Sequence, residues 1–127
     1  MSKLDYFKAR IEATMSPMDY KQASATAPEK YLLMDVRNAP PHVMKQKIAG
    51  ATMLPLKELA ERAEELNRDK VIVVYCWDVW CNMGAHAAVI LLEKGFDVVE
   101  LAGGIASWNA LKLPTEPLAQ DTWQGTG

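Results

Sequence analysis

Cysteine and histidine are scarce in this sequence, and it has no long apolar segment. The 127 residues include two cysteines and two histidines. Two cysteines so close in sequence cannot staple a fold as the disulfides of small secreted domains do, and with the two histidines they complete no zinc-binding pattern. The longest apolar runs lie near residues 71–77 and 87–92 and are too short to span a bilayer. The sequence therefore predicts no disulfide scaffold, no metal site and no membrane span.

Runs of basic residues are absent as well. The chain has 14 basic and 16 acidic residues and a net charge of −2, so its charge does not favour binding to nucleic acid. Residues 1–10 lack the apolar core of a signal peptide, and we therefore expect a cytoplasmic protein. Apolar residues make up 50% of the chain and charged residues 24%, which is typical of one ordinary globular domain.

The chain alternates short apolar runs with helical patterns. Leu4, Phe7 and Ile11 recur at helical spacing, which predicts an amphipathic helix over residues 1–15. Ser16 is a suitable N-cap for a second helix. Helices are expected near residues 1–15, 16–27, 56–67, 84–95 and 105–112, and strands near residues 31–36, 51–55, 71–76 and 97–102. We expect the helix at 84–95 to be largely buried, because it is apolar on most faces.

Strands that read as continuous apolar runs between helices predict an α/β fold with a parallel sheet covered on both faces. We divide the chain into an N-terminal amphipathic helix at 1–15, a domain at 16–118 and a loose tail at 119–127. The apolar stripe of the first helix is expected to pack on its own domain. A homodimer contact is the alternative.

Cys76 is the strongest candidate for chemistry. It closes the apolar run at 71–76, and a helical pattern follows. In parallel sheets, ligands bind at the carboxyl ends of strands. Backbone amides of residues 77–82 and a helix capped by Asn82 could stabilise negative sulfur, which predicts a Cys76 pKa below about 7.5. The alternative is that Cys76 has only a structural role, as a small buried residue at the end of a strand.

Several motifs together resemble a rhodanese-like domain, from about Ser16 to Pro117. They are Asp35-Val36-Arg37, Gly50-Ala51, Cys76 after a strand, and Gly103-Gly104-Ile105 followed by Trp108. The resemblance implies a five-stranded parallel sheet with helices on both faces and no cofactor. It also implies that Cys76 takes sulfane sulfur from a donor such as thiosulfate, holds it as a persulfide and passes it to a thiol or protein acceptor. Asp35 and Arg37 are expected to brace the site.

The loop after the central strand departs from the common family pattern. It reads Cys76, Trp77, Asp78, Val79, Trp80, Cys81 and Asn82. It is about two residues longer than the common loop, has one acid and no base, and is similar to a subgroup with C-W near the start and C-N near the end. We expect these residues to form the anion-binding loop. Because no base faces a dianion, thiosulfate should be a poorer donor than a less charged persulfide.

Two other functions stay open. The first is a non-enzymatic module that binds a partner or senses oxidants through Cys76 and Cys81. The second is a cysteine phosphatase or arsenate reductase, but such enzymes need an arginine six positions after the cysteine, where this chain has Asn82. Trp77 and Trp80 are expected either to wall the pocket or to face a partner protein.

Overall fold

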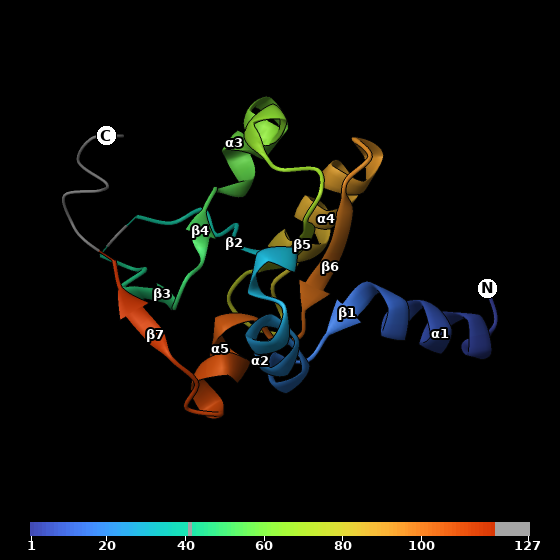
Figure 1. The fold of residues 1–127 in the computed structure, drawn as a ribbon, viewed down its shortest axis with the longest axis horizontal. Coiled ribbons are helices and arrows are strands. Elements are labelled where there is room, and N and C mark those ends of the chain that lie inside the picture. Colours follow the sequence, from blue (N-terminus) through green and yellow to red (C-terminus); the bar gives the residue numbers. More distant parts are fainter. Residues whose placement is uncertain (41, 119–127) are drawn as a thin grey trace.

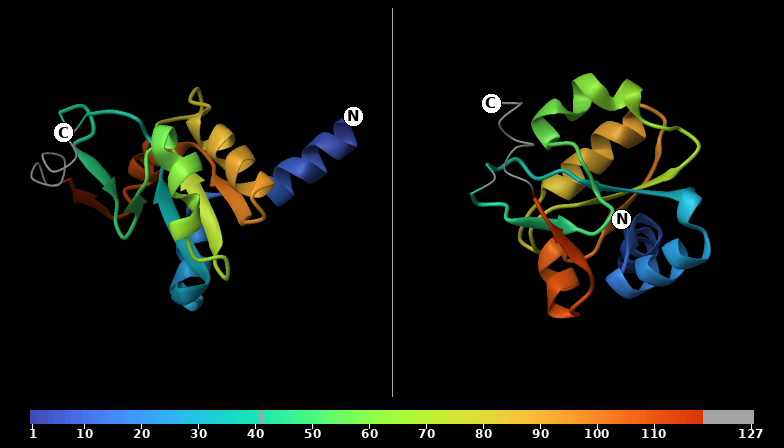
Figure 2. Two further views of the ribbon diagram at one scale, coloured as in Figure 1. Left: turned by 90° about the horizontal axis from the view of Figure 1, so that it is seen from above. Right: turned by 60° about the vertical axis from the view of Figure 1, so that its left-hand side comes forward.

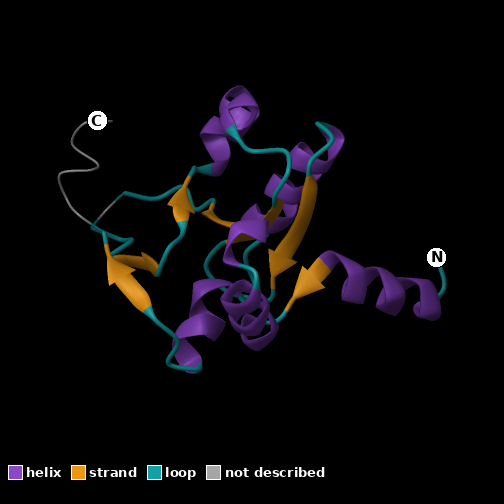
Figure 3. Cartoon of the chain, viewed as in Figure 1, coloured by secondary structure: helices purple, strands orange, loops and turns teal. Residues whose placement is uncertain are grey.

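The computed structural model describes residues 1–40 and 42–118. Its centre is a five-stranded sheet in the order β1-β6-β5-β2-β4, in which every neighbouring pair is parallel (Figures 1 and 3). The strands are β1 (Thr14–Met15), β2 (Tyr31–Asp35), β4 (Thr52–Met53), β5 (Val71–Tyr75) and β6 (Asp97–Leu101). The predicted α/β class and parallel sheet are confirmed. The tail predicted for residues 119–127 lies outside the described residues.

The central strand β5 is buried on both faces, which explains its unbroken apolar sequence. Ile72 and Val74 belong to one core cluster, and Val73 and Tyr75 belong to the other. This division follows from the alternation of side chains along a strand. The strand therefore joins two cores and holds the residue that follows it in a fixed position.

Helices cover both faces of the sheet (Figure 2). Those that cover the sheet are α2 (Pro17–Thr26), α3 (Leu56–Arg62), α4 (Met83–Glu93) and α5 (Gly104–Ala110). The chain also has a first helix, α1 (Lys3–Ala13), and short 3₁₀ helices at Pro28–Lys30 and Ala63–Glu65. Leu59 of α3 and Leu91 of α4 pack on one face of the sheet. Tyr20 of α2 and Trp108 of α5 pack on the other. No helix in the described part of the chain is long and apolar enough to cross a membrane.

A second, two-stranded sheet was not predicted from the sequence. Its strands β3 (Gln46–Ile48) and β7 (Thr115–Pro117) pair antiparallel. Lys47 Nζ forms an ion pair with Glu116 Oε1 at 3.0 Å across this pair. The small sheet brings residues from after β2 beside residues from the end of the domain.

The first helix differs from its prediction in two ways. It ends at Ala13, because Thr14 and Met15 leave the helix and pair with β6, where the Ala102 amide donates to the Met15 carbonyl at 2.9 Å. None of its residues is buried, and Ile11 is 78% exposed. Figure 1 shows α1 projecting beyond the β1 edge of the sheet. The prediction that its apolar stripe packs on its own domain is therefore wrong.

The capping prediction for α2 is confirmed, whereas the burial predicted for the helix at 84–95 is wrong. Ser16 Oγ accepts a hydrogen bond from the Asp19 amide at 3.1 Å. In α4, Ala87 and Leu91 are buried but Val89 is exposed. The helix lies on the outside of the sheet, so one side of it meets solvent whatever its composition.

Candidate active site

Cys76 follows β5 directly and is 3% exposed. Its backbone is held by the start of α5. The Ile105 amide donates to the Cys76 carbonyl at 3.0 Å, and the Ala106 amide donates to the Trp77 carbonyl at 2.9 Å. The first amides of a helix have no partner within it, so they are available for these bonds. The end of β5 and the start of α5 therefore form one fixed unit.

Gly104 permits this contact. Its φ is +60°, and a Cβ built there would lie 2.5 Å from the Cys76 carbonyl oxygen. A side chain would meet both a strained backbone conformation and a backbone clash that no rotamer could relieve. Gly104 is thus explained by the close approach of α5 to the cysteine loop, whereas a Cβ at Gly103, whose φ is +78°, would meet the Ser107 side chain of α5 instead.

The Cys76 thiol is held in its neutral form. Its Sγ donates to the Cys81 carbonyl at 3.4 Å. Burial, followed by the interaction with the Cys81 side chain, raises the pKa of Cys76 to about 12, although the amides of Gly84 and Trp77 act in the opposite direction. The prediction of a lowered pKa is therefore wrong for this arrangement.

The loop amides explain why the anion site expected from the sequence is incomplete. The Cys81 amide donates to the Asp78 carbonyl at 3.0 Å, and the Val79 amide donates to Asp78 Oδ1 at 2.6 Å. These two amides are used within the loop. Asn82 stands at the N-cap position of α4, but its side chain makes no capping hydrogen bond. Burial without enough inward amides leaves the charged form of the thiol disfavoured.

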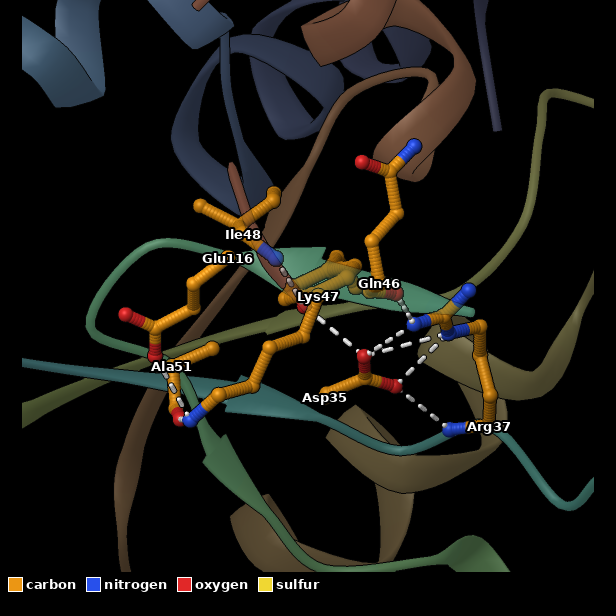
Figure 4. A network of polar contacts seen from close by, with 8 residues as sticks. Asp35, Arg37, Gln46, Lys47, Ile48, Ala51 and Glu116 are labelled. Atoms are coloured by element: carbon orange, nitrogen blue, oxygen red, sulfur yellow. Dashed lines mark hydrogen bonds and ion pairs between the residues drawn. The ribbon is translucent and has the colours of Figure 1, made fainter. Parts of the chain in front are cut away.

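Asp35 and Arg37 form a buried network beside the loop (Figure 4). Arg37 Nη2 lies 2.7 Å from Asp35 Oδ2 and also donates to the Gln46 carbonyl at 2.7 Å. The Tyr75 hydroxyl donates to Asp35 Oδ2 at 2.8 Å and accepts a hydrogen bond from the Ile48 amide at 3.0 Å. Burial, followed by the charge of Asp35, raises the pKa of Tyr75. The network links β2, β3 and β5 through hydrogen bonds, and within it the two charges of Asp35 and Arg37 pair with each other.

Trp77 connects this network to the loop. The guanidinium carbon of Arg37 lies 4.5 Å from the centroid of the Trp77 ring. Such a cation–π contact holds the indole ring against the guanidinium. Through this contact the Asp35–Arg37 network touches the loop, and the bracing role expected for the two residues stays a prediction.

Two cavities flank the loop. The larger, of about 520 Å³, is lined by Cys76, Cys81 and Asn82 of the loop region, Glu100 of β6 and Arg10 of α1, and we call it the Cys76 cavity. The smaller, of about 390 Å³, is lined by Arg37, Lys45, Trp77, Trp80 and Asn109, and we call it the Trp77 cavity. Asp78 lines both.

The cavities divide the candidate residues between them. Trp77 and Trp80 line the Trp77 cavity and not the Cys76 cavity, and Trp80 is 70% exposed. Val79 is also exposed, at the rim of the Cys76 cavity. Sequence reasoning missed Arg10 and Glu100. Arg10 could have been found only if the strand at Thr14–Met15, which joins α1 to the sheet, had been predicted.

The comparisons with known proteins agree with this fold. The family model "Rhodanese-like domain" matches residues 16–111, and the chain belongs to this family. A full-length protein from Lactobacillus plantarum has a similar structure, with a TM-score of 0.86 and 36% identity, over 91% of this chain and 97% of that one. The resemblance inferred from the motifs is confirmed.

Curated relatives carry different names. "Thiosulfate sulfurtransferase PspE" of Escherichia coli is 39% identical over 57% of this chain and 68% of its own length. "HTH-type transcriptional regulator Rv0324" of Mycobacterium tuberculosis is 38% identical over 66% of this chain. This chain spans only 37% of the length of that regulator. The chain is thus similar to a protein named for sulfur transfer and to part of a protein named for regulation.

Proposed function

We propose that this protein is a sulfurtransferase in which Cys76 carries sulfane sulfur as a persulfide. The observation that carries the proposal is the position of Cys76, at the carboxyl end of the central parallel strand and in the wall of a 520 Å³ cavity. Membership of the rhodanese-like family and similarity to a thiosulfate sulfurtransferase support it.

In the first half-reaction, the Cys76 thiolate attacks the sulfane sulfur of the donor. With thiosulfate, a sulfur–sulfur bond forms to Sγ, the sulfur–sulfur bond of the donor breaks, and sulfite leaves with the bonding electron pair. The amides of Trp77 and Gly84, which favour the charged form of the sulfur, are the groups we assign to stabilising the anionic persulfide.

In the second half-reaction, an acceptor thiolate attacks the outer sulfur of the Cys76 persulfide. The bond to Sγ breaks, Cys76 leaves as a thiolate, and the acceptor becomes a persulfide, so no external oxidant or reductant is consumed. Cys76 and Cys81 are both free thiols. A reducing compartment suits them, and we propose the cytoplasm as the place of action.

A second candidate function is redox sensing by Cys76 and Cys81. The specific observation in its favour is the contact at 3.4 Å between Cys76 Sγ and the backbone carbonyl of Cys81, which keeps the two cysteines next to each other. Oxidation of one thiol by a peroxide and attack by the other would give an internal disulfide and water.

Intact mass measurement after exposure to thiosulfate distinguishes the two functions. The sulfurtransferase gains the mass of one sulfur atom, the gain maps to Cys76, and an added thiol removes it. The sensor gains no sulfur from thiosulfate and instead loses two hydrogens on treatment with hydrogen peroxide. Absence of sulfur on Cys76 with thiosulfate and with a small persulfide would contradict the proposed function.

A further inference from the structure

The Cys76 cavity contains a basic residue that does not come from the cysteine loop. Among the described residues that line the cavity, Arg10 is the only lysine or arginine. It lies in the last turn of α1, outside the residues that match the family model. Tyr6, one turn earlier on α1, lines the same cavity. The projecting helix therefore contributes side chains to the cavity that holds the candidate nucleophile.

Hydrogen bonds hold the backbone of Arg10 at the end of α1. Its carbonyl accepts hydrogen bonds from the Thr14 amide and from Thr14 Oγ1, the latter at 2.6 Å. Thr14 pairs with Glu100 of β6, and Glu100 also lines the cavity. The end of α1 is thus joined to the strand that forms one wall of the cavity.

Arg10 supplies the one positive charge among the described lysine and arginine residues of the cavity, which also has two acidic residues. Two carboxyl groups, those of Asp78 and Glu100, line the cavity with it. Within the described residues, no ion pair engages the Arg10 guanidinium. Its hydrogen-bond donors are therefore available to a ligand, and without its charge the cavity would repel an anion.

We propose that Arg10 is the donor-binding residue of this site and that the donor carries an anionic group, as thiosulfate does. Arg10 holds the oxyanion end of the donor while Cys76 attacks the sulfane sulfur, and the same contact receives the sulfite that leaves with the electron pair. The assignment deepens the proposed sulfur transfer and rests on it. It differs from the expectation from the loop sequence, in which no base faces the donor and thiosulfate is poorer than a less charged persulfide.

Alkylation of Cys76 tests the contact without requiring sulfur transfer. In a Cys81→Ser background, the rate with anionic iodoacetate is divided by the rate with neutral iodoacetamide. Arg10→Gln should lower this ratio about tenfold, because only the anionic reagent uses the guanidinium. Arg10→Lys should restore part of it. Lys8→Gln is the matched control, since it removes one charge from the same helix at a residue that does not line the cavity, and it should leave the ratio unchanged.

Steady-state kinetics then connect the contact to the reaction. Arg10→Gln should raise the KM for thiosulfate about tenfold, equivalent to about 1.4 kcal/mol, with a smaller change in kcat. A lowered alkylation ratio in a protein that transfers no sulfur would support the anion contact and reject the proposed function. An unchanged ratio in Arg10→Gln would overturn the inference about Arg10, whether or not the protein transfers sulfur.

Discussion

The two cavities beside the cysteine loop differ in how their walls are built. Arg37, in the wall of the Trp77 cavity, belongs to a buried ion pair whose members are also hydrogen-bonded to backbone and to Tyr75. The Cys76 cavity is lined by a thiol, two carboxyl groups and an arginine for which the described residues provide no ion pair. The arginine of the Trp77 cavity is buried and paired with Asp35, whereas the arginine of the Cys76 cavity has its charge available to a ligand. This difference favours bracing on the Trp77 side and chemistry on the Cys76 side.

The first prediction separates the two thiols of the Cys76 cavity. Cys76→Ser should lower sulfur transfer about a thousandfold or more, because it removes the atom that carries the persulfide. Cys81→Ser should keep more than about half of the activity, since Cys81 contacts Cys76 through its backbone carbonyl and a serine retains that group. Thiocyanate formation from thiosulfate and cyanide measures both variants. Equal losses would show that the two cysteines act together, as the sensor requires.

The second prediction concerns the Asp35–Arg37 ion pair beside the Trp77 cavity. Asp35→Asn leaves the Arg37 guanidinium buried with no carboxylate partner and should lower the free energy of unfolding by about 3 kcal/mol. Glu58→Gln breaks an exposed pair with Arg62 and should lower the free energy of unfolding far less, because solvent screens that pair. Chemical denaturation of both variants makes the measurement. Similar losses in the two would mean that the network does not hold the loop as described.

Sequence reasoning succeeded where the signal was local or repeated. The apolar run before Cys76 predicted β5, and the order of the motifs identified the family. It failed for β1 at Thr14–Met15 and for the β3–β7 pair, because strands of two or three residues form through pairing partners and have no period of their own. The direction of the loop amides and the return of Arg10 to the cavity depend on tertiary geometry, so no pattern in the loop could show them.

The third prediction uses the raised pKa of Cys76. Since that pKa is about 12, only a small fraction of the thiol is ionised near pH 7. The rate of Cys76 alkylation by iodoacetamide, measured in Cys81→Ser, should therefore rise about tenfold per pH unit up to pH 9 or beyond, with no plateau near neutral pH. A midpoint below pH 8 would show that the loop amides stabilise the thiolate after all.

The raised pKa of Cys76 also determines whether the free energy of unfolding rises or falls with pH. The folded state holds Cys76 protonated above the ordinary thiol pKa of about 8.5, so this contribution is fully present below pH 8.5 and is lost as the pH rises toward 12. Unfolding free energy should therefore fall with alkaline pH, and Cys76→Ser should reduce the slope. An equal slope in the two proteins would assign the alkaline loss to other groups.

The last and smallest effect concerns Asp78, which lines both cavities. Asp78→Asn removes one negative charge near the proposed donor site, and the amide oxygen can still accept the hydrogen bond from the Val79 amide. The KM for thiosulfate should fall about threefold, because a partly exposed charge that does not touch the donor contributes less than a direct contact. Asp97→Asn is the control, since Asp97 is exposed at the opposite end of β6 from the cysteine loop. A KM that falls equally in both variants would show that net charge, and not the charge of this cavity, governs donor binding.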